Sequence, residues 1–365
     1  MHSSSGRAAV SFSRLEEPVG FGKVLPLGKD LGWALLLFLL ASCEAPDSTV
    51  GSVTDNFEAL WTQLDQKYCF FDYKAAEYGL DWDEVHDRYA AQVADTLTSR
   101  AFFDLMAGMV NELRDGHTNL IGPWYTSSYS AFYADYPHNF SSDLLLATLG
   151  HDYYYSHGAY YRILPDSIGY VYINSFSSTL SDAFVSELFR YFSACRGLVV
   201  DVRDNGGGSL EQSRSLSARF MKEKTLVGYI SHKTGPAHDA FSDPVPMYVE
   251  PDTTLSAWLR PVCVLTNRHS FSATNDFVRV MRRLPHVTIV GDRTGGGSGL
   301  PMSTDIPCGW TLRYSASPIY DVDMQHTEFG IDPDVRVDIT PQDLLSGHDA
   351  ILHTAVSLLM SVAEE

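Results

Sequence analysis

A serine that could act as a nucleophile lies in the segment HSFSATND at residues 269–276. This segment joins a predicted strand to a predicted helix, so Ser272 would lie near the N-terminus of that helix. The helix dipole and the N–H of Ala273 would there favour an oxyanion formed on an attacked carbonyl. Serine at the start of a helix more often caps the helix, so this segment alone leaves both roles open.

A hydroxyl nucleophile needs a base, and His117 in the segment LRDGHT at residues 113–118 is one candidate. The pKa of an unperturbed imidazole lies near neutrality. The chain has 13 histidines, so spacing alone does not select this one. Glu328 precedes a turn rich in glycine and proline and could orient the histidine, although such a carboxylate is more often a solvated turn residue.

A glycine-rich loop, DVRDNGGG at residues 201–208, follows an apolar run and precedes a predicted helix. Consecutive glycines let backbone N–H groups point at a ligand without obstruction by side chains. The loop could therefore be a phosphate cradle, an oxyanion hole or a plain tight turn. The glycines alone do not distinguish these three roles.

Composition excludes several classes of function. The chain has 365 residues, 45% of them hydrophobic, and a formal net charge of −19, so we expect a globular protein that does not bind nucleic acid. None of its five cysteines forms a CxxC pair. The last four could include a disulfide, but small buried hydrophobic residues are favoured. No histidine pair at helical spacing has a third ligand nearby, so we expect no metal.

The N-terminal region reads as a secretory signal. Residues 31–42 form an apolar run that is too short to span a membrane and ends in small residues, and basic residues precede it. Leu40-Ala41-Ser42-Cys43 resembles the lipobox of bacterial lipoproteins, in which the cysteine is acylated. We therefore expect a signal peptide over residues 1–43. The mature protein would be an exported bacterial lipoprotein, anchored through Cys43 to a membrane and facing the periplasm or the cell surface.

The remaining chain divides into three predicted parts. Apolar residues with helical periodicity predict a helical N-terminal domain over residues 44–121. Residues 122–161 lack a clear period and predict a loop-rich connection. Residues 162–365 alternate between strand and helix patterns, which predicts an α/β core. Its predicted strands are 168–173, 197–202, 262–266 and 287–290, and its predicted helices are 182–192, 211–221 and 273–283.

Taken in order, these segments resemble the C-terminal processing and tricorn-core serine peptidases. The similarity includes the DGHT element at Asp115, the glycine-rich loop after Asp201, SxSA at Ser270, GDRTGG at Gly291 and a GIxPD turn at Gly330. It implies a Clp-protease/crotonase-like core of ββα units, preceded by a small helical domain.

The resemblance also implies roles for individual residues. The nucleophile would be Ser272. The oxyanion hole would combine the N–H groups of Ala273 and Gly207. We favour Gly207 over Gly206 because many relatives carry proline, which has no N–H, at the position of Gly206.

The base indicates the branch of the family. Processing peptidases use a lysine at the position that Gly297 occupies, which disfavours a Ser/Lys dyad. Tricorn-like peptidases use a histidine and a glutamate, matched by His117 and Glu328. In tricorn-like peptidases a serine just before the histidine links it to the glutamate, and this chain has Gly116 at that position. Glu328 would therefore act on His117 directly, through water or more weakly. We also expect no PDZ domain.

These residues predict a serine-type peptidase that hydrolyses peptide bonds through a Ser272 acyl-enzyme, without metal or organic cofactor. Its partners would be peptide or protein substrates, together with the membrane that holds the anchor. The alternative is a catalytically weak lipoprotein on the same fold that binds peptides or apolar ligands. A nucleotide-binding enzyme is disfavoured, because the stretch 291–298 resembles a P-loop but lacks its lysine.

Overall fold

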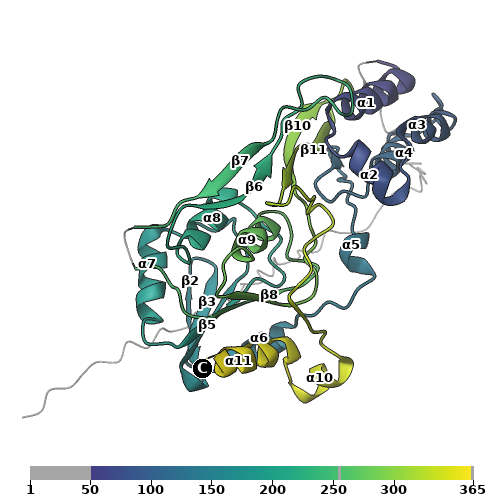
Figure 1. Ribbon diagram of the computed structural model, residues 1–365. Coiled ribbons are helices and arrows are strands. Elements are labelled where there is room, and N and C mark those ends of the chain that lie inside the picture. The colour runs from purple at the N-terminus through teal and green to yellow at the C-terminus, as the bar shows by residue number, and fades with distance from the viewer. Residues whose placement is uncertain (1–50, 254–255, 363–365) are drawn as a thin grey trace, which may run out of the picture. The chain divides into compact units, whose positions relative to one another are not determined.

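The computed structural model describes residues 51–253 and 256–362 (Figure 1). The chain divides into a unit before Pro46 and a larger unit from Pro46 onward, and the described residues belong to the larger unit. The predicted signal peptide and Cys43 lie outside the described residues. Within the described ranges, no helix is both long enough and apolar enough to cross a bilayer.

Four helices at the start of the described chain form the predicted helical unit. Ser52 begins the first with a capping box, and Asp81 and Thr98 cap the third and fourth through their side chains. Phe57, Leu60 and other apolar residues spaced by helical periodicity form the buried core. The helices are α1 (Val53–Lys67), α2 (Phe71–Tyr78), α3 (Trp82–Ala90) and α4 (Ser99–Asn111).

The helical unit shares its core with a sheet that contains strands from the C-terminal third of the chain. Phe103 of α4 packs edge-on against Trp310, with ring centroids 5.2 Å apart. Leu312 and Tyr314 belong to the same apolar cluster. The residues before and after the predicted domain boundary at residue 121 therefore share one hydrophobic core. This sheet contains β1 (Asn119–Ile121), β6 (Thr225–Ile230), β7 (Val245–Val249), β10 (Gly299–Asp305) and β11 (Thr311–Tyr320).

A second, seven-stranded sheet has the order β12-β9-β8-β5-β4-β3-β2. Neighbouring strands from β4 to β12 run parallel, whereas β2 and β3 pair antiparallel at one edge. The central strands are continuous apolar runs, as expected for strands covered on both faces. The strands are β2 (Tyr154–Ser156), β3 (Ala159–Leu164), β4 (Ile168–Ile173), β5 (Gly197–Asp201), β8 (Val262–Thr266), β9 (Val287–Gly291) and β12 (Val335–Arg336).

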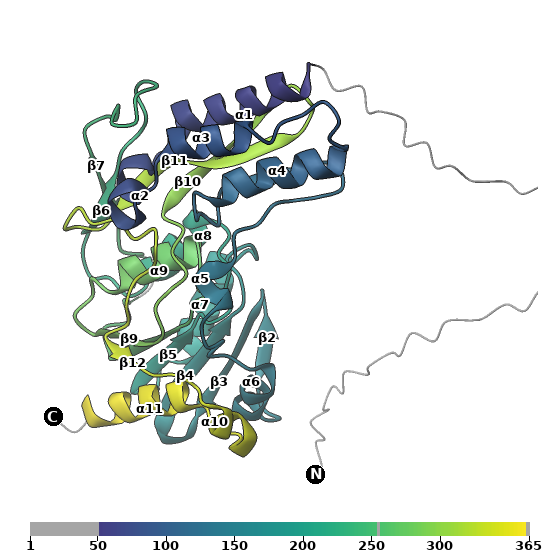
Figure 2. The same ribbon diagram turned by 90° about the vertical axis from the view of Figure 1, so that its right-hand side faces the viewer.

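Helices cover both faces of the seven-stranded sheet (Figure 2). On one face lie α7 (Asp182–Tyr191), α8 (Leu210–Ala218) and α9 (Ala273–Met281). On the other lie α6 (Ser142–Leu149) and α11 (Ala350–Val362). The predicted α/β class and its alternation of strands and helices are confirmed. The shorter helices are α5 (Ala131–Ala134), α10 (Pro341–Ser346) and a 3₁₀ turn (Pro165–Ser167).

The region 122–161 differs from the expected loop-rich connection. It contains α5, α6 and β2, and β3 begins within it. Leu144, Leu145 and Leu149 of α6 pack against the sheet. The tyrosines of β2 stay exposed because this strand lies at the edge of the sheet, so they leave no alternating pattern in the sequence.

Cysteine behaves as predicted in the described part of the chain. Cys69, Cys195 and Cys263 are buried, Cys308 is half-buried, and all four are free thiols. They pack as small apolar residues rather than as cross-links.

A buried ion network fixes the start of the glycine-rich loop. Arg203 Nη2 donates to Asp201 Oδ2 at 2.6 Å and to Asp349 Oδ2 at 2.9 Å. Asp201 ends β5, and Asp349 immediately precedes α11. The network therefore joins the last helix to the strand from which residues 204–208 emerge, with each buried charge paired.

Candidate active site

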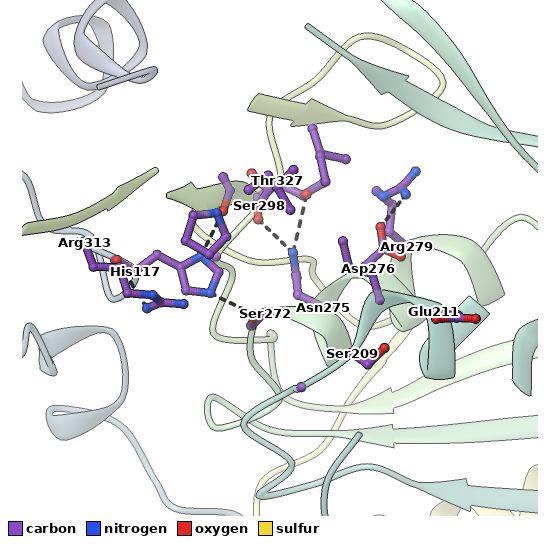
Figure 3. A pocket seen from close by; sticks show the side chains of 17 residues that line it. His117, Ser209, Glu211, Ser272, Asn275, Asp276, Arg279, Ser298, Arg313 and Thr327 are labelled. Carbon is purple, nitrogen blue, oxygen red and sulfur yellow. Dashed lines mark hydrogen bonds and ion pairs between the residues drawn. The ribbon is translucent and has the colours of Figure 1, made fainter. Parts of the chain in front are cut away.

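Ser272 lies at a sharp turn between β8 and α9. Its φ of +61° and ψ of −120° are rare for a residue with a side chain. Its hydroxyl makes no capping bond to the helix. Instead, Oγ lies 2.8 Å from His117 Nε2 (Figure 3). The helix-cap interpretation of Ser272 is therefore wrong, and the strained turn serves to aim the hydroxyl at the histidine.

The turn that carries Ser272 is fixed on both sides. The Ser270 hydroxyl donates to Val202 O at 2.8 Å and accepts from the Asn267 N–H at 3.1 Å. The Ser272 N–H donates to Gly296 O at 2.9 Å. The first serine of SxSA is thus a buried structural residue, and the second is the one available for chemistry.

His117 is held by its own turn and by β10. The Asp115 carboxylate accepts from the His117 N–H at 2.7 Å. His117 Nδ1 lies 3.0 Å from Gly299 O. A carbonyl oxygen can only accept, so Nδ1 carries the proton and the lone pair on Nε2 faces Ser272. Ser272 and His117, which are 155 positions apart in the sequence, form a hydroxyl–imidazole pair.

Glu328 is buried nearby but does not contact His117. Its Oε2 accepts from the Ser298 N–H at 2.8 Å, and its Oε1 lies 3.5 Å from Lys74 Nζ. The structure therefore does not form the direct bond to His117 that the resemblance allowed. The carbonyl of Gly299 occupies that orienting position.

Lys74 is a site residue that sequence reasoning missed. It comes from α2, is fully buried, and donates from Nζ to Arg114 O at 3.0 Å. It lies on an amphipathic helix with no motif around it, so no local signal marks it. Its ammonium group lies beneath the turn that carries His117 and favours the ionised form of two buried carboxyl groups, Asp115 and Glu328.

Burial sets the protonation states of these groups. Burial lowers the pKa of His117 to about 4, against the opposing effect of Asp115. Burial and the charge of Asp115 raise the pKa of Glu328 to about 8. Burial alone would raise the pKa of Asp115, but Lys74, His117 and hydrogen bonds together lower it. At neutral pH, His117 is therefore a neutral imidazole that can accept a proton.

The ring of Phe271 explains two departures from the family patterns. A Cβ at Gly116 would lie 2.9 Å from Phe271 Cζ, so the serine of tricorn-like peptidases has no room there. A Cβ at Gly297 would lie 2.5 Å from the same atom, which excludes the lysine of processing peptidases. Phe271 also contacts the His117 ring edge-on and stacks on Phe132.

The glycine-rich loop approaches the nucleophile closely. A Cβ at Gly207 would lie 2.8 Å from Ser272 Cβ, and its φ is +101°. However, the Gly207 N–H donates to Asn205 Oδ1 at 3.0 Å. Gly208 instead borders the cleft, and its N–H, like that of Ala273, has no acceptor among the described residues. Of the predicted oxyanion donors, the Ala273 N–H is therefore free among the described residues, whereas the Gly207 N–H is already bonded.

Ser272 and His117 line a cleft with a volume of about 420 Å³. Figure 3 shows Arg313 beside His117, and Asp276 and Arg279 lie farther along the cleft. Asp276 is ion-paired with Arg279 and Arg214. The cleft therefore combines apolar wall residues such as Leu300 and Ile319 with charges of both signs, which suits a substrate with a polar backbone and varied side chains.

The glycine-rich stretch at residues 291–298 does not form a phosphate cradle. The N–H groups of Thr294, Gly295 and Gly297 donate to protein carbonyls. The Ser298 N–H is bonded to Glu328. These N–H groups are therefore not available to a nucleotide, and the stretch supports the active-site turn instead.

Known proteins share both halves of this architecture. The model for peptidase family S41 matches residues 167–337, and that for the tricorn protease C1 domain matches residues 52–111. A candidate peptidase from Parabacteroides merdae, known from its crystal structure, is 51% identical, with a TM-score of 0.81 over 85% of this chain and 97% of that one. Tricorn protease of Thermoplasma acidophilum is 27% identical over 200 residues, which are 53% of this chain and 17% of that protein.

A more distant structure shares the fold. Mature CPAF in complex with lactacystin has a TM-score of 0.68 at 13% identity, covering 86% of this chain and 98% of that one. Among curated sequences, the chain spans less than a fifth of the length of the first tricorn-type relatives, at 19%, 17% and 15%.

Steric exclusion by Phe271 can be tested through stability. We expect Gly116→Ser to lower the free energy of unfolding by roughly 1–3 kcal/mol, because its Cβ would overlap the Phe271 and Phe132 rings. The loss should be smaller when Gly116→Ser is introduced into a Phe271→Leu background than in wild type, as measured by urea unfolding.

Gly206→Ser is the matched control, because a Cβ there has no atom within 4 Å. Its effect should stay within about 0.5 kcal/mol. Strictly additive effects of Gly116→Ser and Phe271→Leu would contradict the exclusion.

Proposed function

Because this chain belongs to peptidase family S41, we propose that its Ser272 and His117 hydrolyse peptide bonds in peptide or protein substrates through an acyl-enzyme. The observation that carries the proposal is the 2.8 Å contact between Ser272 Oγ and His117 Nε2. A nucleophile within hydrogen-bond reach of a base that a third group orients is the arrangement that covalent hydrolysis requires.

The steps follow from the positions of the atoms. His117 Nε2 takes the proton of Ser272 as Oγ attacks the substrate carbonyl carbon. The N–H groups of Ala273 and Gly208 stabilise the resulting oxyanion. The tetrahedral intermediate collapses when His117 protonates the leaving amine, and water then hydrolyses the ester with His117 again acting as base.

The positive charge that develops on His117 needs support. The Nδ1–H bond to Gly299 O fixes the ring, while the buried Asp115 charge stabilises the imidazolium electrostatically. Glu328 contributes through Ser298 and Lys74, which hold the backbone next to Gly299 and the turn before His117. In this proposal Glu328 is a positioning residue.

A binding protein on the same fold is the alternative function. It would need no aligned nucleophile and base, and no residue in a strained turn. The strained turn at Ser272 directs its hydroxyl to His117, an alignment that catalysis uses and that binding a ligand does not require. The family relationship and the geometry therefore favour the peptidase.

Covalent labelling tests the nucleophile. We expect a fluorophosphonate probe to label the wild type but not Ser272→Ala, and peptide hydrolysis by Ser272→Ala to fall by about 10³-fold or more. Ser298→Ala is the matched control, because Ser298 lines the same cleft and its hydroxyl has no hydrogen-bond partner among the described residues. This control should still be labelled. Labelling of Ser272→Ala at the wild-type level would refute the assignment.

The pH profile tests the role of His117. Because its pKa is about 4, the imidazole stays neutral well below pH 6.5, and kcat/KM should stay level from neutral pH to about pH 5 and then fall. An apparent pKa near 6.5 in that profile would contradict the buried, neutral base.

Circular dichroism over the same pH range provides the control for this profile. A histidine whose pKa is lower in the folded state removes stability as the pH falls from about 6.5 toward 4. Loss of folded structure must therefore be distinguished from loss of the base.

We also propose that the protein is exported and anchored through a lipid on Cys43. The support is the apolar run that ends in Leu40-Ala41-Ser42-Cys43. In bacterial cells fed a labelled fatty acid, the wild type should incorporate the label and Cys43→Ser should not. Cys308→Ser, which removes a half-buried free thiol, is the control and should remain labelled. Equal labelling of wild type and Cys43→Ser would exclude this anchor.

A further inference from the structure

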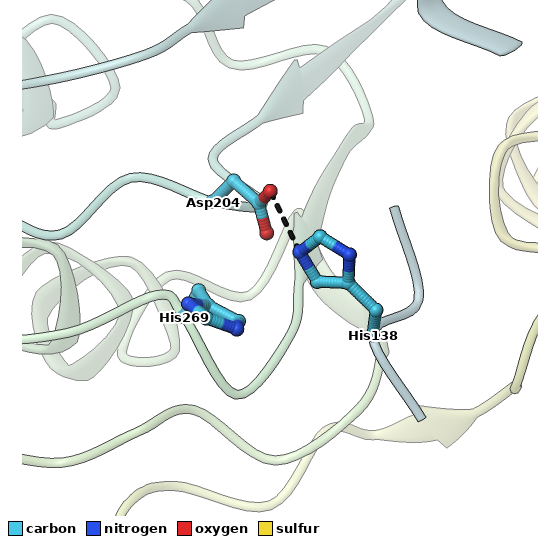
Figure 4. A group of neighbouring side chains, drawn as sticks. All are labelled: His138, Asp204 and His269. Carbon is cyan, nitrogen blue, oxygen red and sulfur yellow. Dashed lines mark ion pairs between the residues drawn. The ribbon is translucent and has the colours of Figure 1, made fainter. Parts of the chain in front are cut away.

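Three potential metal ligands lie close together (Figure 4). His138, Asp204 and His269 each offer one ligand atom, and these atoms lie within 4.8 Å of one another. His138 Nε2 lies 2.9 Å from Asp204 Oδ2. The rings of His138 and His269 have centroids 4.9 Å apart. Within the described residues, this is the one group of three such side chains that could hold a metal ion.

We propose that this cluster binds a divalent transition-metal ion, with Zn²⁺ as the best match. Two imidazole nitrogens and one carboxylate oxygen are ligands typical of zinc. At metal–ligand distances of about 2.0–2.1 Å, tetrahedral ligand atoms lie roughly 3.3 Å apart. The cluster needs only a modest closure to reach that spacing. His138 is 57% exposed, so the ion has access from solvent and a water can complete the coordination.

The backbone of Asp204 supports a dedicated site. Asp204 has a φ of +56°, in the left-handed region that few residues other than glycine adopt. This conformation directs its carboxylate toward the two histidines (Figure 4). Residues in such conformations persist where the surroundings hold them, and they concentrate at functional sites.

The buried side chain of Asn267 hydrogen-bonds to all three candidate ligand residues. Asn267 Nδ2 donates to Asp204 Oδ1 at 2.6 Å and to His138 O at 2.8 Å. Asn267 Oδ1 accepts from the N–H groups of Asp204 and His269 at 3.0 and 3.1 Å. Supporting hydrogen bonds of this kind orient ligands before the metal arrives.

An ordinary ion pair does not explain the whole cluster. The contact between His138 and Asp204 would by itself be a surface pair of small energetic value. It does not involve His269, whose ring packs against Tyr133 with centroids 4.2 Å apart while a ring nitrogen stays within 4.8 Å of the other two ligand atoms. A shared cation would give the convergence of two imidazole nitrogens and one carboxylate oxygen a common function, because all three could then coordinate the same ion.

The three ligands come from three separate segments. His138 lies between α5 and α6, Asp204 begins the glycine-rich loop, and His269 precedes Ser272 by three residues. The bound ion would therefore tie the α5–α6 connection to both loops of the active site. This inference does not depend on peptidase activity.

Binding can be measured on the full-length chain after metal has been removed by a chelator. We expect calorimetric titration with Zn²⁺ to show a site that is weakened about tenfold or more in His269→Ala and in Asp204→Asn. Asparagine tolerates the left-handed conformation, so Asp204→Asn should keep the fold. Zn²⁺ should also raise the Tm of the wild type more than that of either variant.

The double variant His348→Ala/His353→Ala is the matched control. These two rings lie 4.2 Å apart elsewhere on the surface, so the control tests whether any close histidine pair suffices. It should bind Zn²⁺ as the wild type does, and Co²⁺ bound to the wild type should show the visible absorption of a tetrahedral site. Wild-type affinity in His269→Ala, loss of binding in the control, or no binding by the wild type would each overturn the proposal.

Discussion

The buried carboxylate of Asp115 is the contact on which the position of His117 depends. It accepts hydrogen bonds from the His117 N–H, the Thr118 hydroxyl and the Ser315 hydroxyl. Ser315 belongs to β11, so one carboxylate fixes the turn after the helical unit to a strand almost 200 residues later. A buried charge of this kind is stable only when it is compensated, and Lys74 supplies the opposite charge. The charges of Asp115 and Lys74 thus both stabilise the fold and hold His117 in position.

The ring of Phe271 adds a steric constraint to this arrangement. Its ring occupies the space that a serine at position 116 or a lysine at position 297 would need. Its contact with the His117 ring also helps to exclude water from the base. The ring between the two serines of SxSA therefore lies against both glycines and the proposed base, while the positive φ of Gly297 independently disfavours a side chain there.

The sequence was sufficient to predict the family, the α/β class and the strands β4 and β8 to the residue, because these features have local patterns. It also singled out Ser272 and His117, whose motifs occur in a recognisable order and whose side chains the fold brings together. It could not identify Lys74, the Gly299 carbonyl or Gly208, because their roles follow from long-range packing and from which N–H groups are already bonded. The proposed metal cluster has the same origin, because His138, Asp204 and His269 are distant in the sequence and come together only in the fold.

The pairing of β1 with β11 has a consequence for when this protein can become active. β1 follows His117 directly, and its partner residues Thr311, Leu312 and Arg313 are among the last third of the chain to be synthesised. Ser315, Gly299 and Ser272 also lie in that third. A growing polypeptide therefore carries the base early but cannot position it until translation is nearly complete. A partial chain that ends before β11 therefore lacks the strand pairing and the Ser315 hydroxyl that hold the turn carrying His117.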